Sequence, residues 1–456
     1  MIHKASTAMF LLMGIAGCSG LPDMQRAEQE AAAGNLGAAR AELTKLAEFG
    51  LADAQVELGD LYSDEESEAA FDKALRWYRA AAEQGNDRAL SRLGKLYARE
   101  GKTATQRGKG EFYLKKAMAA GDDSALMPLI ELYLDHPGEF PDAEPVGWIQ
   151  RAREKGDPSG DLALARYYIL NGQLQARAGE IVSLCEPIAI SHPDCLVILA
   201  RVYLAERQND RFDTLVARAR EAWEQDKIDD RDLYVFARWL SDDESPAKQV
   251  AVTNDLYQLL IPDYVPAITG RARLIMDNTY LANAEEVIRL LETSRSQGDL
   301  KASLTLARLY ERGRIVPIDA RKAIQYAREA SEKYPSADYL LGRIYKRGYL
   351  GEPEPRKARD HLLKAARSGY PKADYLLAEM FWEGKGIQVN KLYAWSFALL
   401  ATDAGLPRAR ELLVEMVPQM PKALEQAAET LANRELAARR QAAGASHQTN
   451  KQRQGG

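Results

Sequence analysis

The sequence predicts an all-α fold, a right-handed superhelical solenoid of about ten antiparallel helix-pair repeats. Three observations lead to this prediction: a signature that recurs about every 35 residues, an apolar stripe at helical spacing inside each copy, and turn residues between the copies. A helix pair of this size cannot bury its apolar face alone. Consecutive copies must therefore stack on one another and share one elongated core.

The recurring signature ends in an aromatic or large apolar residue. In the first copy, "AQVELGDLY", residues Ala54, Leu58, Leu61 and Tyr62 lie on one face of a helix. The final residues of successive copies fall at positions 62, 97, 133, 168, 203, 240, 275, 310, 345 and 381. This rhythm persists through the two weakest copies, so the helical period is predicted for the whole middle of the chain.

A small residue recurs inside the signature, as at Gly94 and Gly342. Glycine costs a helix about 1 kcal/mol relative to alanine, so its reuse in one register predicts a close approach of two helices. A second helical pattern follows each signature, for example "ARDHLLKAARSG" (358–369). Junctions such as Gly298-Asp299 place a left-handed glycine directly before a capping side chain, which ends one helix and starts the next.

The amino terminus reads "MFLLMGIAGCSG", with an apolar run over 9–16. This run is too short to span a bilayer, which needs about 20 apolar residues, and it has the pattern of a secretory signal. Ile15-Ala16-Gly17-Cys18 resembles the bacterial lipobox, which implies cleavage before Cys18 and lipidation of its thiol. Two or more acyl chains anchor a protein stably. Ser19 is not the aspartate that retains many lipoproteins in the inner membrane, so we expect the periplasmic face of the outer membrane. The alternative is an ordinary signal peptide in which the cysteine is incidental.

The overall charge argues against nucleic acid as a partner. The net charge of −5 and the pI near 5.8 give no global attraction for nucleic acid.

With Cys18 lipidated, Cys185 and Cys195 remain in an oxidising compartment, where pairing is permitted. The sequence leaves two alternatives open for this pair, a disulfide or two small buried residues that fill the repeat core.

No motif for catalysis emerges. The five histidines show no metal-ligand spacing, and Gly101-Lys102-Thr103 lacks the glycine that a phosphate-binding loop needs five residues earlier. Acidic pairs such as Asp242-Asp243 fall between predicted helices, where solvated loops explain them. We therefore predict no catalytic residue, no metal and no cofactor, and a protein that is not an enzyme.

One segment is locally basic. Residues 343–367 hold eight cationic side chains against three acidic ones. The cationic residues are Arg343, Lys346, Arg347, Arg356, Lys357, Arg359, Lys364 and Arg367. They are a candidate docking patch for an acidic partner or for local contact with a polyanion, and the alternative is an ordinary solvated face.

The predicted organisation has five parts. They are a lipoprotein signal peptide (1–17), a lipidated amino terminus with the first helices (18–50), the solenoid (51–417, irregular around 204–297), a capping helix (418–441) and a disordered tail (442–456).

The best copies, "LARLYERGRIVPIDARKAIQYAREA" (306–330) and "LAEMFWEGKGIQVNKLYAWSFALLATDAG" (377–405), resemble the Sel-like subset of the tetratricopeptide superfamily. Together with the lipobox and the polar tail, the chain resembles the lipoprotein K family of bacterial alginate secretion systems. That resemblance implies a non-catalytic outer-membrane scaffold that assists the polysaccharide porin and links it to periplasmic polymer-modifying or polymerisation proteins. The alternatives are a lipoprotein adaptor that localises a cell-wall enzyme and, less favoured, a polysaccharide-active enzyme.

Overall fold

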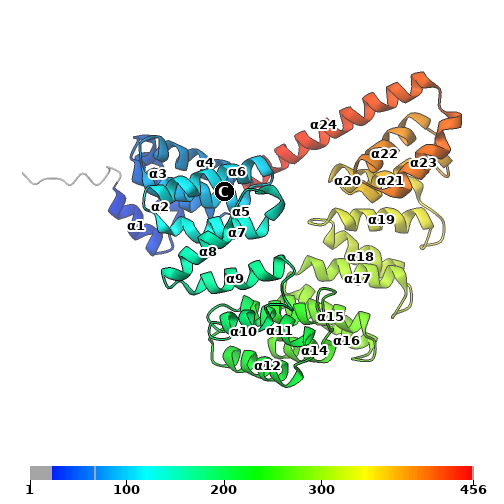
Figure 1. Ribbon diagram of the computed structural model, residues 1–456. Coiled ribbons are helices and arrows are strands. Elements are labelled where there is room, and N and C mark those ends of the chain that lie inside the picture. Colours follow the sequence, from blue (N-terminus) through cyan, green and yellow to red (C-terminus); the bar gives the residue numbers. More distant parts are fainter. Residues whose placement is uncertain (1–22, 66–67, 454–456) are drawn as a thin grey trace, which may run out of the picture. The chain divides into compact units, whose positions relative to one another are not determined.

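The computed structural model describes residues 23–65 and 68–453, and the signal peptide and Cys18 lie outside them. The chain divides into two compact units, Met1–Gln173 and Leu174–Gly456. Within the described residues both units consist of helices and connecting turns without a strand, which confirms the all-α prediction (Figure 1).

Unit 1 begins with a helix pair and continues with the first repeats (Figure 1). Its helices are α1 (Met24–Ala32), α2 (Leu36–Glu48), α3 (Ala52–Ser63), α4 (Glu68–Glu83), α5 (Asp87–Glu100), α6 (Ala104–Ala119), α7 (Leu126–Asp135), α8 (Pro145–Glu154) and α9 (Pro158–Leu170). Two short 3-10 turns, η1 (Asp123–Ala125) and η2 (Pro137–Glu139), flank α7.

Unit 2 continues the same alternation of helices. Its helices are α10 (Ala178–Cys185), α11 (Asp194–Ala205), α12 (Asn209–Glu224), α13 (Asp230–Leu240), α14 (Val250–Leu260), α15 (Val265–Asp277), α16 (Ala284–Ser296), α17 (Leu300–Arg312), α18 (Ala320–Ala330), α19 (Pro335–Arg347), α20 (Pro355–Arg367), α21 (Pro371–Glu383), α22 (Lys391–Asp403), α23 (Pro407–Met416) and α24 (Lys422–Arg453). The 3-10 turn η3 (Val417–Gln419) precedes α24.

Each of the ten predicted signatures forms the first helix of a pair. These first helices are α3, α5, α7, α9, α11, α13, α15, α17, α19 and α21. The period survives the irregular stretch 204–297, where α13 and α15 occupy the registers that the spacing requires. The prediction of about ten helix-pair repeats is therefore confirmed.

The junctions have the predicted caps. Gly298 adopts a φ of +88°, a left-handed conformation that suits glycine, and Asp299 then caps α17 by accepting a hydrogen bond from the Lys301 amide. The same arrangement recurs at Gly85-Asn86 before α5.

The small residues in the first helices do permit close packing. A β-carbon on Gly94 would lie 2.6 Å from Leu114 Cγ and 2.8 Å from the Leu114 backbone nitrogen. A β-carbon on Gly342 would lie 2.6 Å from Leu362 Cγ. In both cases the second helix of the same pair occupies the space that a side chain would need.

This packing predicts opposite effects for one substitution at two sites in unit 1. Gly94→Ala gains helix propensity but forces α5 and α6 apart, so we expect a net loss of about 1–2 kcal/mol in the free energy of unfolding. Gly108→Ala in α6 is the matched control, because no atom lies within 4 Å of the added carbon, and it should stabilise by about 1 kcal/mol. Urea unfolding followed by circular dichroism checks both values. Equal effects at the two sites would contradict the close approach.

The carboxyl-terminal helix packs on the last repeat. Ala428 and Ala432 of α24 are buried, and the Ser396 hydroxyl of α22 donates to the Ala428 carbonyl at 2.9 Å. The helix continues to Arg453, whereas the sequence analysis places a disordered tail from residue 442. The alanine and glutamine residues of this segment favour helix, which accounts for the difference.

Candidate functional site

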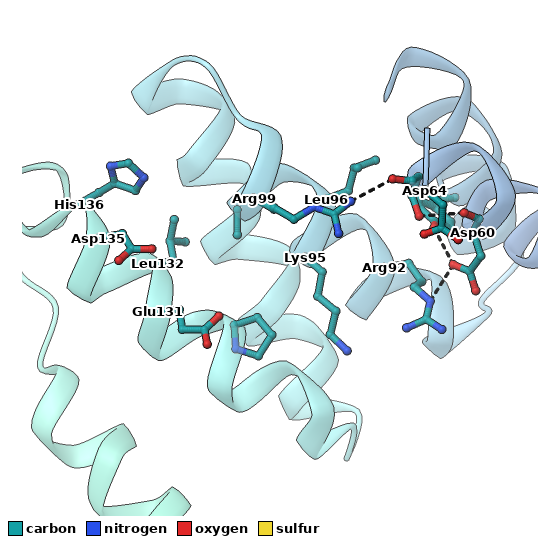
Figure 2. A pocket seen from close by; sticks show the side chains of 14 residues that line it. Asp60, Asp64, Arg92, Lys95, Leu96, Arg99, Glu131, Leu132, Asp135 and His136 are labelled. Atoms are coloured by element: carbon teal, nitrogen blue, oxygen red, sulfur yellow. Dashed lines mark hydrogen bonds and ion pairs between the residues drawn. The ribbon is translucent and has the colours of Figure 1, made fainter. Parts of the chain in front are cut away.

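Three cavities in the described part of the chain are lined mainly by first helices of the pairs. In unit 1 a cavity of about 660 Å³ is lined mainly by α3, α5 and α7. Figure 2 shows Arg92, Lys95 and Arg99 side by side on α5, with acidic groups of α3 on one side and of α7 on the other. Its lining carboxylates are Asp60, Asp64, Glu131 and Asp135.

The charges of this unit 1 cavity largely satisfy one another. Arg92 Nε lies 2.8 Å from Asp60 Oδ1, and the same carboxylate accepts a hydrogen bond of 2.6 Å from the Tyr78 hydroxyl. Burial lowers the pKa of Lys95, and the positive charge of Arg92 lowers it further. Arg99 donates to the Ser63 carbonyl at 3.0 Å. Asp60 is thus held in a polar network with a cation and a hydroxyl group.

Unit 2 carries two cavities whose walls are strongly basic. One, of about 490 Å³, is lined from α15 and α17, and the other, of about 950 Å³, from α19, α21 and α23. We call their cationic lining the inner basic face. It consists of Arg273, Arg308, Arg312, Arg314, Arg343, Lys346, Arg347, Lys372 and Arg408. The acidic residues that line the same two cavities are Asp277 and Glu379.

Some cations of the inner basic face form ion pairs with glutamates of the neighbouring first helices. Glu311 is 2 % exposed and lies 2.7 Å from Arg343 and 3.4 Å from Arg347. Lys346 lies 2.9 Å from Glu379 on the next first helix. These cross-repeat pairs place successive first helices within side-chain reach of each other.

The remaining cations have no such partner in the described chain. No carboxylate among residues 23–65 and 68–453 is within ion-pair distance of Arg273, Arg312, Lys372 or Arg408. All four side chains are exposed. The face therefore retains a net positive charge in a protein whose formal net charge is −5.

The predicted basic patch separates into two surfaces. Arg343, Lys346 and Arg347 belong to α19 and line the larger cavity, whereas the other five residues lie on α20 and line neither cavity. The α20 residues are Arg356, Lys357, Arg359, Lys364 and Arg367. The turn at 348–354 reverses the chain, so cations that are close together in the sequence lie on two different surfaces.

Most of the α20 cations are paired locally. Lys357 lies 2.5 Å from Glu354, Lys364 lies 2.9 Å from Asp338, and Arg367 lies 3.2 Å from Glu435. Arg359 is paired with its neighbour Asp360 at 2.7 Å. The three α19 residues are also ion-paired, and they differ from the α20 residues in that they line the larger cavity.

Most residues of the inner basic face were not predicted from the sequence. Arg273, Arg308 and Arg312 are far from the dense run at 343–367 and form no local charge cluster. A signal was nevertheless present, because one arginine stands two residues before the final residue of six consecutive signatures. These arginines are Arg166, Arg201, Arg238, Arg273, Arg308 and Arg343. These arginines become apparent when the same position is compared between repeats, whereas a search for dense runs of charge does not find them.

Comparison with known proteins decides the family. The chain is 34 % identical to the alginate biosynthesis protein AlgK of Pseudomonas syringae pv. tomato, over 79 % of this chain and 77 % of that protein. It is 31 % identical to AlgK of Azotobacter vinelandii, over 78 % of this chain and 79 % of that one. The chain belongs to the AlgK family of alginate biosynthesis proteins. This confirms the resemblance drawn from the repeats.

Family profiles support the repeat assignment in detail. The AlgK tetratricopeptide repeat domain matches residues 177–260, and the Sel1 repeat matches 52–86, 301–334, 335–370 and 371–406. The first match covers much of the stretch where the Sel-like pattern weakens. Among solved structures, the protective antigen c5321 of uropathogenic Escherichia coli, which displays an SLR fold, aligns with 90 % of this chain and 97 % of its own at 22 % identity and a TM-score of 0.42.

Within the described residues, no group of three or more His, Cys, Asp or Glu side chains is arranged to hold a metal ion. His361 accepts or donates a hydrogen bond at 2.9 Å to Asp338, which is itself 1 % exposed. None of the helices in 23–65 and 68–453 is long and apolar enough to cross a membrane.

Cys185 and Cys195 lie close together in the core of unit 2. Both side chains are buried, and their sulfur atoms are 2.8 Å apart. The turn between α10 and α11 brings them together, as the sequence analysis considered. A disulfide between them stays a prediction.

We expect these two cysteines to be joined by a disulfide in protein isolated from an oxidising compartment. Closing a loop of this length should contribute about 3 kcal/mol to stability. The measurement is iodoacetamide labelling of the denatured Cys18→Ser chain, with and without prior reduction. Labelling of both thiols without reduction would show that they are simply buried core residues.

Proposed function

We propose that this AlgK-family protein is a non-catalytic scaffold of an alginate secretion complex, held by lipid at the periplasmic face of the outer membrane. In this role it assists the outer-membrane polysaccharide porin and links it to periplasmic proteins that modify or polymerise the chain. The observation that carries the proposal is the combination of AlgK-family membership with a body built almost wholly of repeated helix pairs.

Stacked helix pairs suit this role for a physical reason. Each repeat contacts mainly its neighbours, so within each unit the fold exposes a row of first helices. Such a row can hold several partners at different repeats. Asp60 of the unit 1 cavity is paired with Arg92 and accepts a hydrogen bond from Tyr78, which favours a structural role for this carboxylate over a catalytic one.

Depletion of the protein in alginate-producing cells tests the proposal. We expect the amount of folded porin in the outer membrane to fall together with polymer export, and expression of the intact chain to restore both. Unchanged porin and unchanged export after depletion would refute the assisting role. Shortening or chemical change of alginate by the purified protein would instead favour an enzyme.

A further inference from the structure

One end of unit 1 presents two exposed apolar side chains. Phe49 is 80 % exposed and Leu51 is 45 % exposed, and they flank Gly50 in the turn between α2 and α3. Single exposed apolar residues are common on protein surfaces, so exposure alone assigns them no role. Their role follows from the composition of this turn and from its distance to Cys18.

The turn differs from the other repeat junctions of unit 1. Each of those junctions has a polar residue after its glycine, and that side chain accepts a hydrogen bond from a backbone amide of the helix that follows. The polar residues are Asn86, Asp122 and Asp157. Leu51 occupies the same position before α3 and makes no such bond, so this junction lacks a favourable helix cap. The stability of the repeat therefore does not explain an apolar residue here.

The same end of unit 1 lies beside the start of the described chain. Helices α1 and α2 pack against each other and are joined by a short turn, so α1 begins where α2 ends (Figure 1). Asp23 caps α1. Met24 packs against a core cluster that contains Leu46 and Ala47 of the last turn of α2. The amino end of α1 is therefore next to the turn at 49–51.

The proposed lipid anchor lies a short distance before α1. With cleavage before Cys18, residues 18–22 join the lipidated thiol to Asp23. Five residues span at most about 18 Å, even when the chain is fully extended. Covalent geometry therefore holds the amino end of α1, and with it the turn at 49–51, close to the surface of the bilayer.

We propose that Phe49 and Leu51 insert into the interfacial region of the phospholipid bilayer beside the lipid anchor, so that this end of unit 1 rests on the membrane. The inference depends on the proposed lipidation of Cys18 and adds a second contact, made by the protein itself, with the same membrane. Phenylalanine and leucine are side chains that proteins bury at the boundary between headgroups and acyl chains. Insertion removes their apolar surface from water.

The charges around the turn favour a contact driven by apolar burial. The exposed charged residues in the adjoining helix ends are mixed in sign, and they are Asp23, Arg26, Lys45, Glu48 and Asp53. This set gives no net attraction for anionic lipid, so the contact should respond little to salt. A protein partner fits the turn less well, because a stable protein interface buries about 800 Å² on each partner, far more than two side chains of one turn supply.

The first test uses the chain from Cys18 to Gly456 with one tetradecyl group attached to the Cys18 thiol through a maleimide. A single acyl chain binds a bilayer only marginally, so the loss of a second contact is measurable. We expect the double variant Phe49→Ser, Leu51→Ser to partition at least fivefold more weakly into neutral phosphatidylethanolamine–phosphatidylcholine vesicles. The matched control is Leu36→Ser, which changes a residue that is 51 % exposed at the opposite end of α2, and its partitioning should stay within twofold of the parent.

A second measurement locates the contact without weakening it. Phe49→Trp and Leu36→Trp each add one tryptophan to the same acylated chain, and the vesicles carry brominated lipid. We expect the added emission at position 49 to be quenched and shifted to the blue, and the added emission at position 36 to be unchanged. Circular dichroism at 222 nm checks that all variants are folded.

Three results would overturn the membrane contact. They are equal partitioning of the double variant and its parent, equal quenching at positions 49 and 36, and unquenched emission at position 49. Unquenched emission that shifts to the blue as protein concentration rises would assign the turn to a second copy of the chain. Because the acyl group is attached in vitro, these results do not depend on lipidation in cells, so the contact and the natural anchor can fail independently.

Discussion

Replacement of Cys18 by serine is expected to move the protein from the outer-membrane fraction to the soluble periplasm. The lipobox-like Ile15-Ala16-Gly17-Cys18 is the feature on which the proposed anchor depends, and stable anchoring requires more than one acyl chain. Without the thiol no chain can be attached, so we expect at least a tenfold fall in the membrane-bound fraction. Cell fractionation with palmitate labelling measures it.

Two controls separate anchoring from sorting. Ser19→Ala should change neither labelling nor location. Ser19→Asp should retain labelling but shift the protein towards the inner membrane, because aspartate at this position retains many lipoproteins there. A Cys18→Ser protein that still fractionates with the outer membrane would exclude the lipid anchor as the principal attachment.

The second large effect concerns the junction between α24 and the last repeats. Asp374 of α21 is 2 % exposed and accepts two hydrogen bonds from Arg439 of α24, at 2.6 and 3.1 Å. Arg439→Met would leave this carboxylate buried without its cation. We expect a loss of about 3–5 kcal/mol in the free energy of unfolding, since the desolvation cost remains and the compensating charge is gone.

The stability lost in Arg439→Met is expected to depend on pH. Burial raises the pKa of Asp374, and Arg439 opposes this rise. In Arg439→Met the opposition is removed, so the folded-state pKa lies further above the unfolded value. The destabilisation is then present when the carboxyl is ionised and is relieved as pH falls through the folded-state pKa. The difference between variant and parent should therefore shrink from pH 7 towards pH 4.

Urea unfolding at several pH values measures this effect, and hydrogen exchange locates it in α24. The double variant Asp374→Leu, Arg439→Met is the matched control, because it removes both charges and should recover most of the lost stability. A single variant as stable as the parent at pH 7 would show that α24 is not held by this ion pair.

The repeat architecture was predictable from the sequence because it depends on local and periodic information. The recurring final residues, such as Tyr97 and Tyr345, mark first helices whose partners follow at once along the chain. Caps such as Gly298-Asp299 are local as well. Even the weak copies at 240 and 275 were placed correctly, since stacked repeats must keep their spacing.

The inner basic face was only partly predictable, because it depends on which side of each helix lines the cavities. Arg343 and Arg356 are close in the sequence, but the turn between α19 and α20 assigns them to different surfaces. Arg273 and Arg308 are distant in the sequence, but stacking brings their registers into one row. The extension of α24 beyond residue 441 was also missed, because a polar, glycine-containing terminus resembles a disordered tail by composition alone.

The most direct measurement for the scaffold role is affinity purification of the tagged, lipidated protein from detergent-solubilised outer membranes after mild crosslinking. Quantitative mass spectrometry should find the polysaccharide porin and at least one periplasmic polymer-modifying protein in fixed ratio to it. Recovery of the protein alone, from cells that are exporting alginate, would contradict the account.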